Sequence, residues 1–215
     1  MSAEVIGVDL GGTKVAVANL RAQKLSDSLT EPTDLSSSDA LVDQLARMIE
    51  SRRSDQLDGV GIGVPSVVDF ESGRVVSSVN VPLADVRLRQ VLGDKLGVPV
   101  FVDNDATVAA LAEAHDHDLR LVARDLVMIT VGTGVGGGLV LGGRIYRGAT
   151  GGAGELGHTL IAADLSSGVP QPADFPQPGS FEHEASGHTL DALAATCARR
   201  HPDSVLGRLA AAGKP

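Results

Sequence analysis

The sequence predicts an α/β protein with two lobes around a cleft. Short β-branched strands alternate with helices of apolar periodicity through the first part of the chain. A strand, a glycine–threonine turn and a second strand occur at Gly11–Thr13 and again at Gly132–Gly134. Apolar residues make up 43% of the 215 residues, which is enough for a folded core. The repeated hairpin indicates a structural duplication, with lobes at residues 1–117 and 118–215.

The first lobe is expected to begin with a hairpin and continue with alternating helices and strands. Val5–Leu10 and Lys14–Leu20 predict its two strands, because β-branched residues flank the glycine turn. Ser36–Ser38 precede apolar residues at helical spacing, which predicts a capped helix. The later expected elements are strands at 59–64 and 73–79, a helix at 85–96 ended by Gly97, a strand at 98–102 and an alanine-rich helix at 106–117.

The second lobe repeats the order of strand, turn and strand. Residues 125–131 and 135–141 predict the two strands, and Gly142-Gly143 lead into a further short segment, Arg144–Tyr146. Residues 165–180 contain four prolines and predict a loop. Helical composition follows at 181–200 and 203–212.

Composition excludes several classes of function. The net charge of −9 argues against sequence-independent binding to nucleic acid, and an aromatic content of 2% without tryptophan argues against base stacking. The single cysteine, Cys197, excludes an internal disulfide and fits a cytoplasmic location. No window approaches ~20 apolar residues, so we expect neither a signal peptide nor a membrane span. The expected partners are small molecules.

The glycine turns can hold an anion, because their backbone N–H groups can converge without obstruction by side chains. A Walker loop is absent. The dinucleotide fingerprint G-x-G-x-x-G occurs at Gly132–Gly137 and Gly152–Gly157, but neither match opens a recognisable helix. The favoured interpretation is the paired phosphate hairpins of the actin-like (ribonuclease H-like) ATPase fold, and ordinary β-hairpin turns are the alternative.

In the actin-like interpretation the chain binds ATP and magnesium. Asp9, at the end of the first strand, would help to hold a hydrated magnesium ion, since magnesium keeps several waters and takes few carboxylates. Thr13 and Thr133 would donate hydroxyl hydrogens to phosphate oxygens.

Asp105 is the candidate catalytic base. Val102–Asp105 ends a strand and begins a helix, which is where α/β proteins often place functional side chains. Asp105 would accept the proton of an attacking hydroxyl in phosphoryl transfer, because an alcohol is a poor nucleophile at neutral pH. The alternative is that Asn104 or Asp105 only caps the helix.

Glu155 and His158 combine a carboxylate and an imidazole three residues apart between glycines. The favoured role is hydrogen bonding to neighbouring hydroxyls of a polyol. A solvated turn is one alternative. A zinc site is another, completed by some of four later residues, Glu182, His183, Glu184 and His188. Asn80, after the predicted strand end at Ser77–Val79, is a further amide candidate for sugar binding.

Four segments resemble the ROK family of sugar kinases and sugar-responsive repressors: Val8–Lys14, Gly61–Pro65, Val102–Ala106 and Thr130–His158. The resemblance implies Asp105 as the base. It implies sugar contacts at Asn80, Asn104, Asp105, Glu155, His158 and Glu182. It implies phosphate and magnesium loops at Asp9, Gly11, Gly12, Thr13, Lys14, Gly132, Thr133 and Gly134. A homodimer is expected from the resemblance alone.

Two departures from the family pattern affect these expectations. Many members carry a cysteine-rich zinc motif, whereas Gly168–Glu182 contains no cysteine and Ser180 stands where one would be expected, so zinc is expected to be absent. Family chains also continue through further helices, a strand and a glycine-rich adenosine-binding loop. The chain is therefore expected to be truncated at its C-terminus, with an incomplete second lobe.

The expected function is ATP-dependent phosphorylation of a hexose primary hydroxyl, with glucose as the favoured substrate. N-acylhexosamine or other hexose kinases, and a catalytically impaired sugar-binding fragment, are alternatives. A ROK-type transcriptional regulator is less favoured, because those proteins carry a helix-turn-helix ahead of the first strand and Val5 leaves no room for one. Polyphosphate stays open as the phosphoryl donor.

Overall fold

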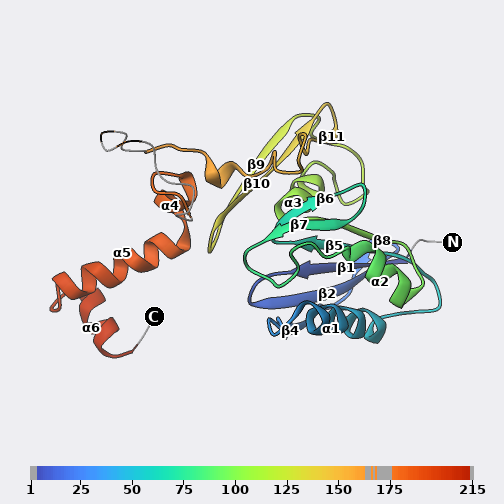
Figure 1. Ribbon diagram of the computed structural model, residues 1–215, viewed down its shortest axis with the longest axis horizontal. Coiled ribbons are helices and arrows are strands. Elements are labelled where there is room, and N and C mark those ends of the chain that lie inside the picture. Colours follow the sequence, from blue (N-terminus) through green and yellow to red (C-terminus); the bar gives the residue numbers. More distant parts are fainter. Residues whose placement is uncertain (1–3, 163–165, 167, 169–175, 214–215) are drawn as a thin grey trace. The chain divides into compact units, whose positions relative to one another are not determined.

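The computed structural model describes residues 4–162, 166, 168 and 176–213 (Figure 1). Tertiary contacts divide the chain into two units. The first unit holds residues 1–128 and 138–154, and the second holds residues 129–137 and 155–215. The predicted lobe boundary at residue 117 stays a prediction.

The first unit is built on a mixed sheet in the order β3-β2-β1-β5-β8, with β4 also paired to β2. β1 and β2 form the predicted antiparallel hairpin, whereas β1, β5 and β8 run parallel. The carboxyl ends of these three strands therefore lie at one edge of the sheet, and this edge carries Asp9, Gly63 and Asn104. The strands are β1 (Glu4–Leu10), β2 (Lys14–Arg21), β3 (Lys24–Leu25), β4 (Leu29–Pro32), β5 (Leu57–Val64) and β8 (Val100–Asn104).

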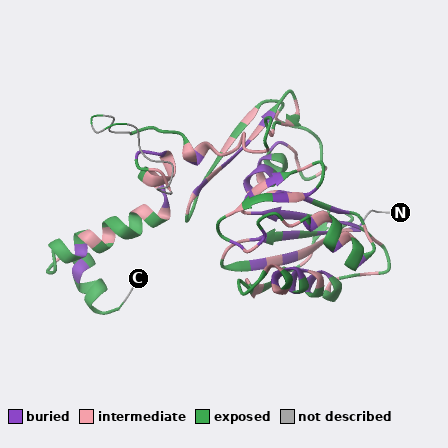
Figure 2. Cartoon of the chain, viewed as in Figure 1, coloured by how far each residue is buried: buried purple, intermediate pink, exposed green. Residues whose placement is uncertain are grey.

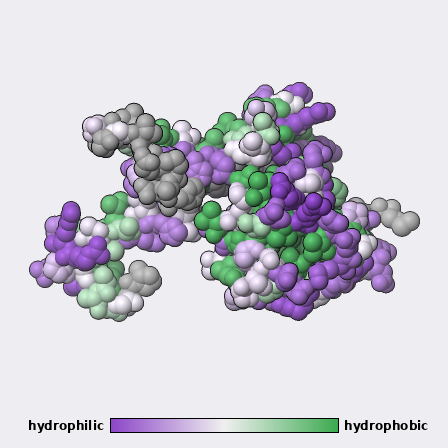
Figure 3. All heavy atoms as spheres, viewed as in Figure 1, coloured by the Kyte–Doolittle hydropathy of each residue, from purple (hydrophilic) through white to green (hydrophobic). Residues whose placement is uncertain are grey.

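Helix α1 (Ser38–Ser51) contributes much of the apolar core of this unit (Figure 2). Its buried face includes Leu41, Leu45 and Met48, and its outward surface is mostly polar (Figure 3). Ser37 is the N-cap, and its side chain accepts a hydrogen bond from the N–H of Ala40. The predicted serine cap is confirmed, because a serine hydroxyl supplies the acceptor that the first helical turn lacks.

Helices α2 (Leu88–Leu96) and α3 (Asp105–Glu113) are both shorter than predicted. α2 does not start at Asp85, because that residue has a positive φ of 64° and its N–H donates to the carbonyl of Val75. α2 ends at Gly97 in the left-handed conformation, as predicted. α3 stops before residue 117 because His115 pairs with Leu121 in a β-bridge.

The remaining described strands form a two-stranded and a three-stranded sheet. β6 (Ser66–Asp69) pairs with β7 (Arg74–Ser78); the sequence predicted β7 but not β6. β9 (Leu126–Val131), β10 (Val135–Leu141) and β11 (Arg144–Ile145) form a three-stranded sheet, which confirms the predicted strands on either side of the second glycine turn.

Gly138 of β10 packs closely on α3, and its substitution supplies a test of this packing. A Cβ at Gly138 would lie 2.4 Å from the Cβ of Ala110 and 2.8 Å from the carbonyl oxygen of Ala106. Gly138→Ala should therefore lower the free energy of unfolding by about 1–3 kcal/mol, measured by urea denaturation. Gly61→Ala is the matched control, because nothing lies within 4 Å of its Cβ position. Equal stability of the two variants would contradict this packing.

The second unit is helical beyond the second glycine turn. Its elements are a 3₁₀ turn at Leu156–His158, α4 (Phe181–Ala185), α5 (Gly187–Arg200) and α6 (Val205–Ala211). The single helix predicted at 181–200 is interrupted at Ser186, whose side chain accepts from the N–H of Thr189 and caps α5. The predicted loop at 165–180 lies partly outside the described residues. In the described part of the chain, no helix is long and apolar enough to cross a bilayer.

Candidate active site

The first glycine turn has two N–H groups without an acceptor in the part of the chain that the structure describes. The N–H of Gly11 donates to the carbonyl of Lys14 at 2.9 Å and closes the turn. Thr33 binds two of the three carbonyls of the turn: its hydroxyl donates to Gly11 at 2.7 Å and its N–H donates to Thr13 at 3.1 Å. Within the described residues, the N–H groups of Gly12 and Thr13 have no acceptor. Two such groups on neighbouring residues suit an anion.

Asp9, Lys14 and Asn80 lie around this turn. Asp9 and Lys14 are exposed, on the strands that lead into and out of the turn. A Cβ on Gly12 would lie 3.4 Å from the Cβ and from the carbonyl oxygen of Asn80. An exposed carboxylate on the strand that leads into this turn fits a hydrated magnesium ion, because magnesium keeps several of its waters.

Asn104 and Asp105 lie at the junction of β8 and α3. Asn104 caps α3, since its Oδ1 accepts from the N–H of Thr107 at 3.0 Å, and its Nδ2 donates to the carbonyl of Ser66 at 3.4 Å. The expected helix cap is therefore Asn104, and a further role of Asn104 or Asp105 stays a prediction. The Oδ1 of Asp105 accepts from the N–H of Ala106 at 2.7 Å.

Gly63 makes room for Asp105 at the carboxyl edge of the sheet. A Cβ on Gly63 would lie 3.2 Å from the Cα of Asp105. The same residue pairs with Asp9 in the parallel register of β1 and β5. The absence of a side chain between these strand ends thus allows Asp105 to lie close to the backbone of β5.

The ion pair of Asp103 and Arg147 is a feature that the sequence analysis missed. Two nitrogens of Arg147, Nη2 and Nε, donate to Oδ2 of Asp103 at 2.6 and 3.0 Å. The other carboxylate oxygen accepts from the N–H of Asn104 at 3.0 Å, and the guanidinium lies 3.8 Å from the ring centre of Phe70. The sequence signal was Asp103 itself, an acid at the end of an apolar strand that needs a buried partner.

The second glycine turn is also closed by the N–H of its first residue, although the acceptor lies two residues on rather than three. The N–H of Gly132 donates to the carbonyl of Gly134 at 2.9 Å, and the carbonyls of Gly132 and Thr133 accept from Gly187 and His188 at 2.7 and 3.3 Å. The N–H groups of Thr133 and Gly134 have no acceptor among the residues that the structure describes. This turn also suits an anion.

The remaining predicted sugar contacts lie near this turn in the second unit. The carboxylate of Glu182 accepts from the N–H of Val135 at 2.7 Å. Glu155 and His158 face each other at 3.3 Å between Oε2 and Nε2. A Cβ on Gly157, between them in sequence, would lie 2.2 Å from the carbonyl oxygen of Val135, so only glycine fits there. The described residues contain no group of three or more His, Cys, Asp or Glu placed to hold a metal ion. The expected lack of zinc stays a prediction.

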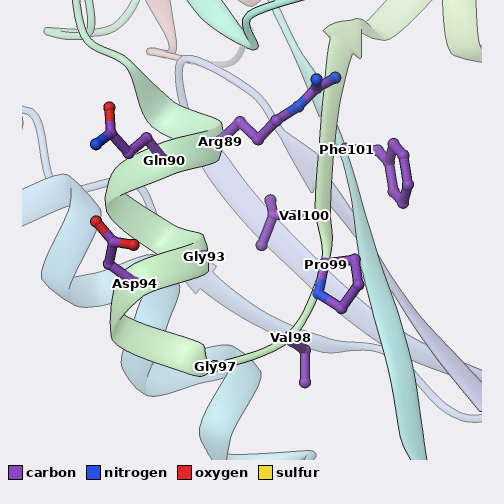
Figure 4. Close-up of a pocket in the computed structure, with 9 residues that line it drawn as sticks. All are labelled: Arg89, Gln90, Gly93, Asp94, Gly97, Val98, Pro99, Val100 and Phe101. Atoms are coloured by element: carbon purple, nitrogen blue, oxygen red, sulfur yellow. The ribbon is translucent and has the colours of Figure 1, made fainter.

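An open groove of about 500 Å³ between α2 and β8 contains none of the predicted site residues (Figure 4). Gln90 and Asp94 of α2 point away from the strand (Figure 4). The guanidinium of Arg89 is bound to the carbonyls of Phe70 and Glu71 at 2.6 and 2.7 Å, so it is occupied by the protein itself. The groove is separate from the candidate site.

The ROK family model matches residues 5–213, which is nearly the whole chain. The chain belongs to the ROK family. A glucokinase of Halalkalibacterium halodurans is 32% identical to this ROK chain over 213 residues, which are 94% of the chain and 62% of the relative. An N-acetyl-D-glucosamine kinase of Photobacterium profundum is 40% identical over 163 residues, which are 74% of the chain and 53% of the relative.

A solved ROK structure matches the fold closely. The ROK family glucokinase of Streptomyces griseus, in complex with glucose and AMPPNP, has a TM-score of 0.77 and 29% identity. The match covers 94% of this ROK chain and 63% of the solved one. It confirms the predicted actin-like α/β fold. The chain spans less than two thirds of the length of these glucokinases.

The predicted site residues of the ROK chain fall into two sets. The first unit brings together the first turn with Asp9 and Asn80, and carries Asn104 and Asp105 at the same edge of its sheet. The second unit brings Glu182 onto the second turn and pairs Glu155 with His158. The roles assigned to these residues remain proposals.

Proposed function

We propose that this chain carries the phosphate and sugar sites of an ATP-dependent hexose kinase, with glucose as the favoured substrate. The supporting observation is common to the two glycine turns: each is closed by its first N–H, and each has two further N–H groups that have no acceptor among the described residues. Backbone N–H groups of glycine turns that have no protein acceptor can bind phosphate groups. The glucokinase relative supports glucose as the sugar, and the solved complex with glucose and AMPPNP supports both glucose and ATP as substrates.

In the proposed reaction, Asp105 accepts the proton of the primary sugar hydroxyl as that oxygen attacks the terminal phosphorus of ATP, and the bond from this phosphorus to the bridging oxygen breaks to release ADP. Asn80, Glu155, His158 and Glu182 would bind the other hydroxyls, and Asn104 has a second Nδ2 hydrogen for a sugar oxygen. Asp9 would hold magnesium through water, and the bound ion would neutralise phosphate charge. The residues would thus position the sugar and the phosphates and accept the hydroxyl proton. Positioning of this kind accounts for a large part of the rate of phosphoryl transfer.

The alternative substrate is an N-acylhexosamine, because the Photobacterium relative is an N-acetyl-D-glucosamine kinase. These sugars differ from glucose by one substituent, and carboxylate, amide and imidazole contacts suit several of them. A domain boundary near residue 117, a homodimer and the absence of zinc belong to the same proposal.

A coupled kinase assay over a panel of hexoses and N-acylhexosamines tests this function, with ATP and polyphosphate as donors. We expect turnover that depends on sugar and on ATP, highest with glucose. Calorimetric glucose binding without turnover would instead support a sugar-binding role for the chain. If the chain shows no turnover and binds no sugar, the proposal is contradicted.

A further inference from the structure

We propose that Glu182 is a positioning residue for the second glycine turn, holding it in the shape that binds phosphate. This role rests on the proposed function and is additional to the sugar contact. One carboxylate would then serve both substrates, with one oxygen on the turn and the other available to a sugar hydroxyl.

The Glu182 carboxylate lies close to two neighbouring residues of the turn, Gly134 and Val135. Oε2 of Glu182 accepts from the N–H of Val135 at 2.7 Å. A Cβ on Gly134 would lie 2.6 Å from the same oxygen. A side chain at position 134 would displace this carboxylate oxygen, so the glycine leaves the room in which Glu182 reaches the backbone of the turn.

The bond fixes one peptide group, the one that joins Gly134 to Val135. Its carbonyl accepts from the N–H of Gly132 at 2.9 Å, and its N–H donates to Glu182. A peptide group is planar, so holding it at both ends sets its orientation. The unbonded N–H groups of Thr133 and Gly134 belong to the two preceding peptide groups, and their directions follow from the same turn geometry.

Hydrogen bonds of helices α4 and α5 fix the backbone of Glu182 relative to the turn. Ser186 ends α4 by donating its N–H to the carbonyl of Glu182 at 3.0 Å, and its side chain caps α5. Gly187, the first residue of α5, donates its N–H to the carbonyl of Gly132 at 2.7 Å. The helix pair is thus attached to the turn at two points, through the backbone of α5 and through the carboxylate of α4.

The negative charge of Glu182 has the opposite effect on phosphate, because a carboxylate near an anion repels it. The two effects can be separated by substitution. Glutamine at position 182 keeps an oxygen that can accept from Val135 and removes the charge, whereas alanine removes both. If positioning dominates, the two variants will differ in phosphate affinity; if repulsion dominates, both will bind phosphate more tightly than the wild type.

Calorimetric titration of the chain with magnesium-ATP and with glucose tests the proposal. We expect Glu182→Ala to weaken binding of each by about tenfold or more, since a lost charge-assisted hydrogen bond has effects of this order. Glu182→Gln should weaken glucose binding and keep magnesium-ATP binding within about twofold of the wild type. Hydrogen exchange at the Val135 amide should be faster in Glu182→Ala and unchanged in Glu182→Gln.

Two control variants separate this role from general damage. The Glu184 carboxylate lies on the same helix but bonds to His183 at 2.9 Å, so Glu184→Ala should leave both affinities unchanged. The Glu155 carboxylate pairs with His158, so Glu155→Ala should weaken glucose binding alone. Unchanged magnesium-ATP affinity in Glu182→Ala, or tighter binding in both Glu182 variants, would overturn the positioning role and leave the proposed function intact. A wild-type chain that binds neither ligand would overturn both.

Discussion

Asp105→Asn is expected to lower kcat for sugar phosphorylation by ~100-fold or more while sugar binding survives. Asparagine has the same size and can still hydrogen bond, but it cannot take the proton of the attacking hydroxyl. Asp105 is the first residue of α3, and its backbone lies close to that of β5 because Gly63 carries no side chain. The backbone of Asp105 is thus placed by rigid secondary structure, which the proposed role as a base requires.

The coupled kinase assay and glucose calorimetry together check this result. Asp94→Asn is the matched control, since Asp94 is an exposed acid on α2 outside the candidate site, and it should leave kcat unchanged. Near-normal turnover in Asp105→Asn would show that another group accepts the proton. A loss of glucose binding equal to the loss of kcat would indicate a binding role instead.

Arg147→Met is expected to lower the free energy of unfolding by about 3 kcal/mol, because it leaves the buried carboxylate of Asp103 without its partner. The Asp103 side chain is only 11% exposed, and two nitrogens of Arg147 bond to it. Methionine keeps the apolar contact with Phe70 but removes the charge. The cost arises from the unpaired buried charge more than from the lost attraction between the two groups.

Urea denaturation with two further variants separates these causes. Arg74→Met removes an exposed ion pair with Asp85 and should cost less than about 1 kcal/mol. Adding Asp103→Asn to Arg147→Met should recover part of the lost stability, because no buried charge then remains. If Arg147→Met costs no more than Arg74→Met, the Asp103–Arg147 pair is not a major contribution to the fold.

Local features of the chain were predictable because their causes lie within a few residues. The Ser37 cap and the end of α2 at Gly97 follow from side-chain and backbone preferences at single positions. The strands on either side of the two glycine turns follow from alternation and β-branched composition. The break at Ser186 was missed, although a serine followed by glycine is a signal for a new helix start.

The candidate site was predictable only in its residue types and their motifs. Its functional interpretation came from the resemblance to the ROK family, which the comparisons confirmed. The bonds of Asp103 to Arg147 and of Glu182 to Val135 were not predicted, because each joins residues more than forty positions apart. Nothing in the local sequence of Gly134 shows that a carboxylate occupies the space beside it.

The sequence alone determined the strand and helix types, the glycine turns and the acids at strand ends, since these depend on local propensity and periodicity. Tertiary structure alone decided which carbonyls close each turn, which acid has an arginine partner and which glycines leave room for a carboxylate. The physical reason is that hydrogen bonds and steric fit between distant segments depend on how the strands and helices pack, and that packing is a property of the folded unit as a whole.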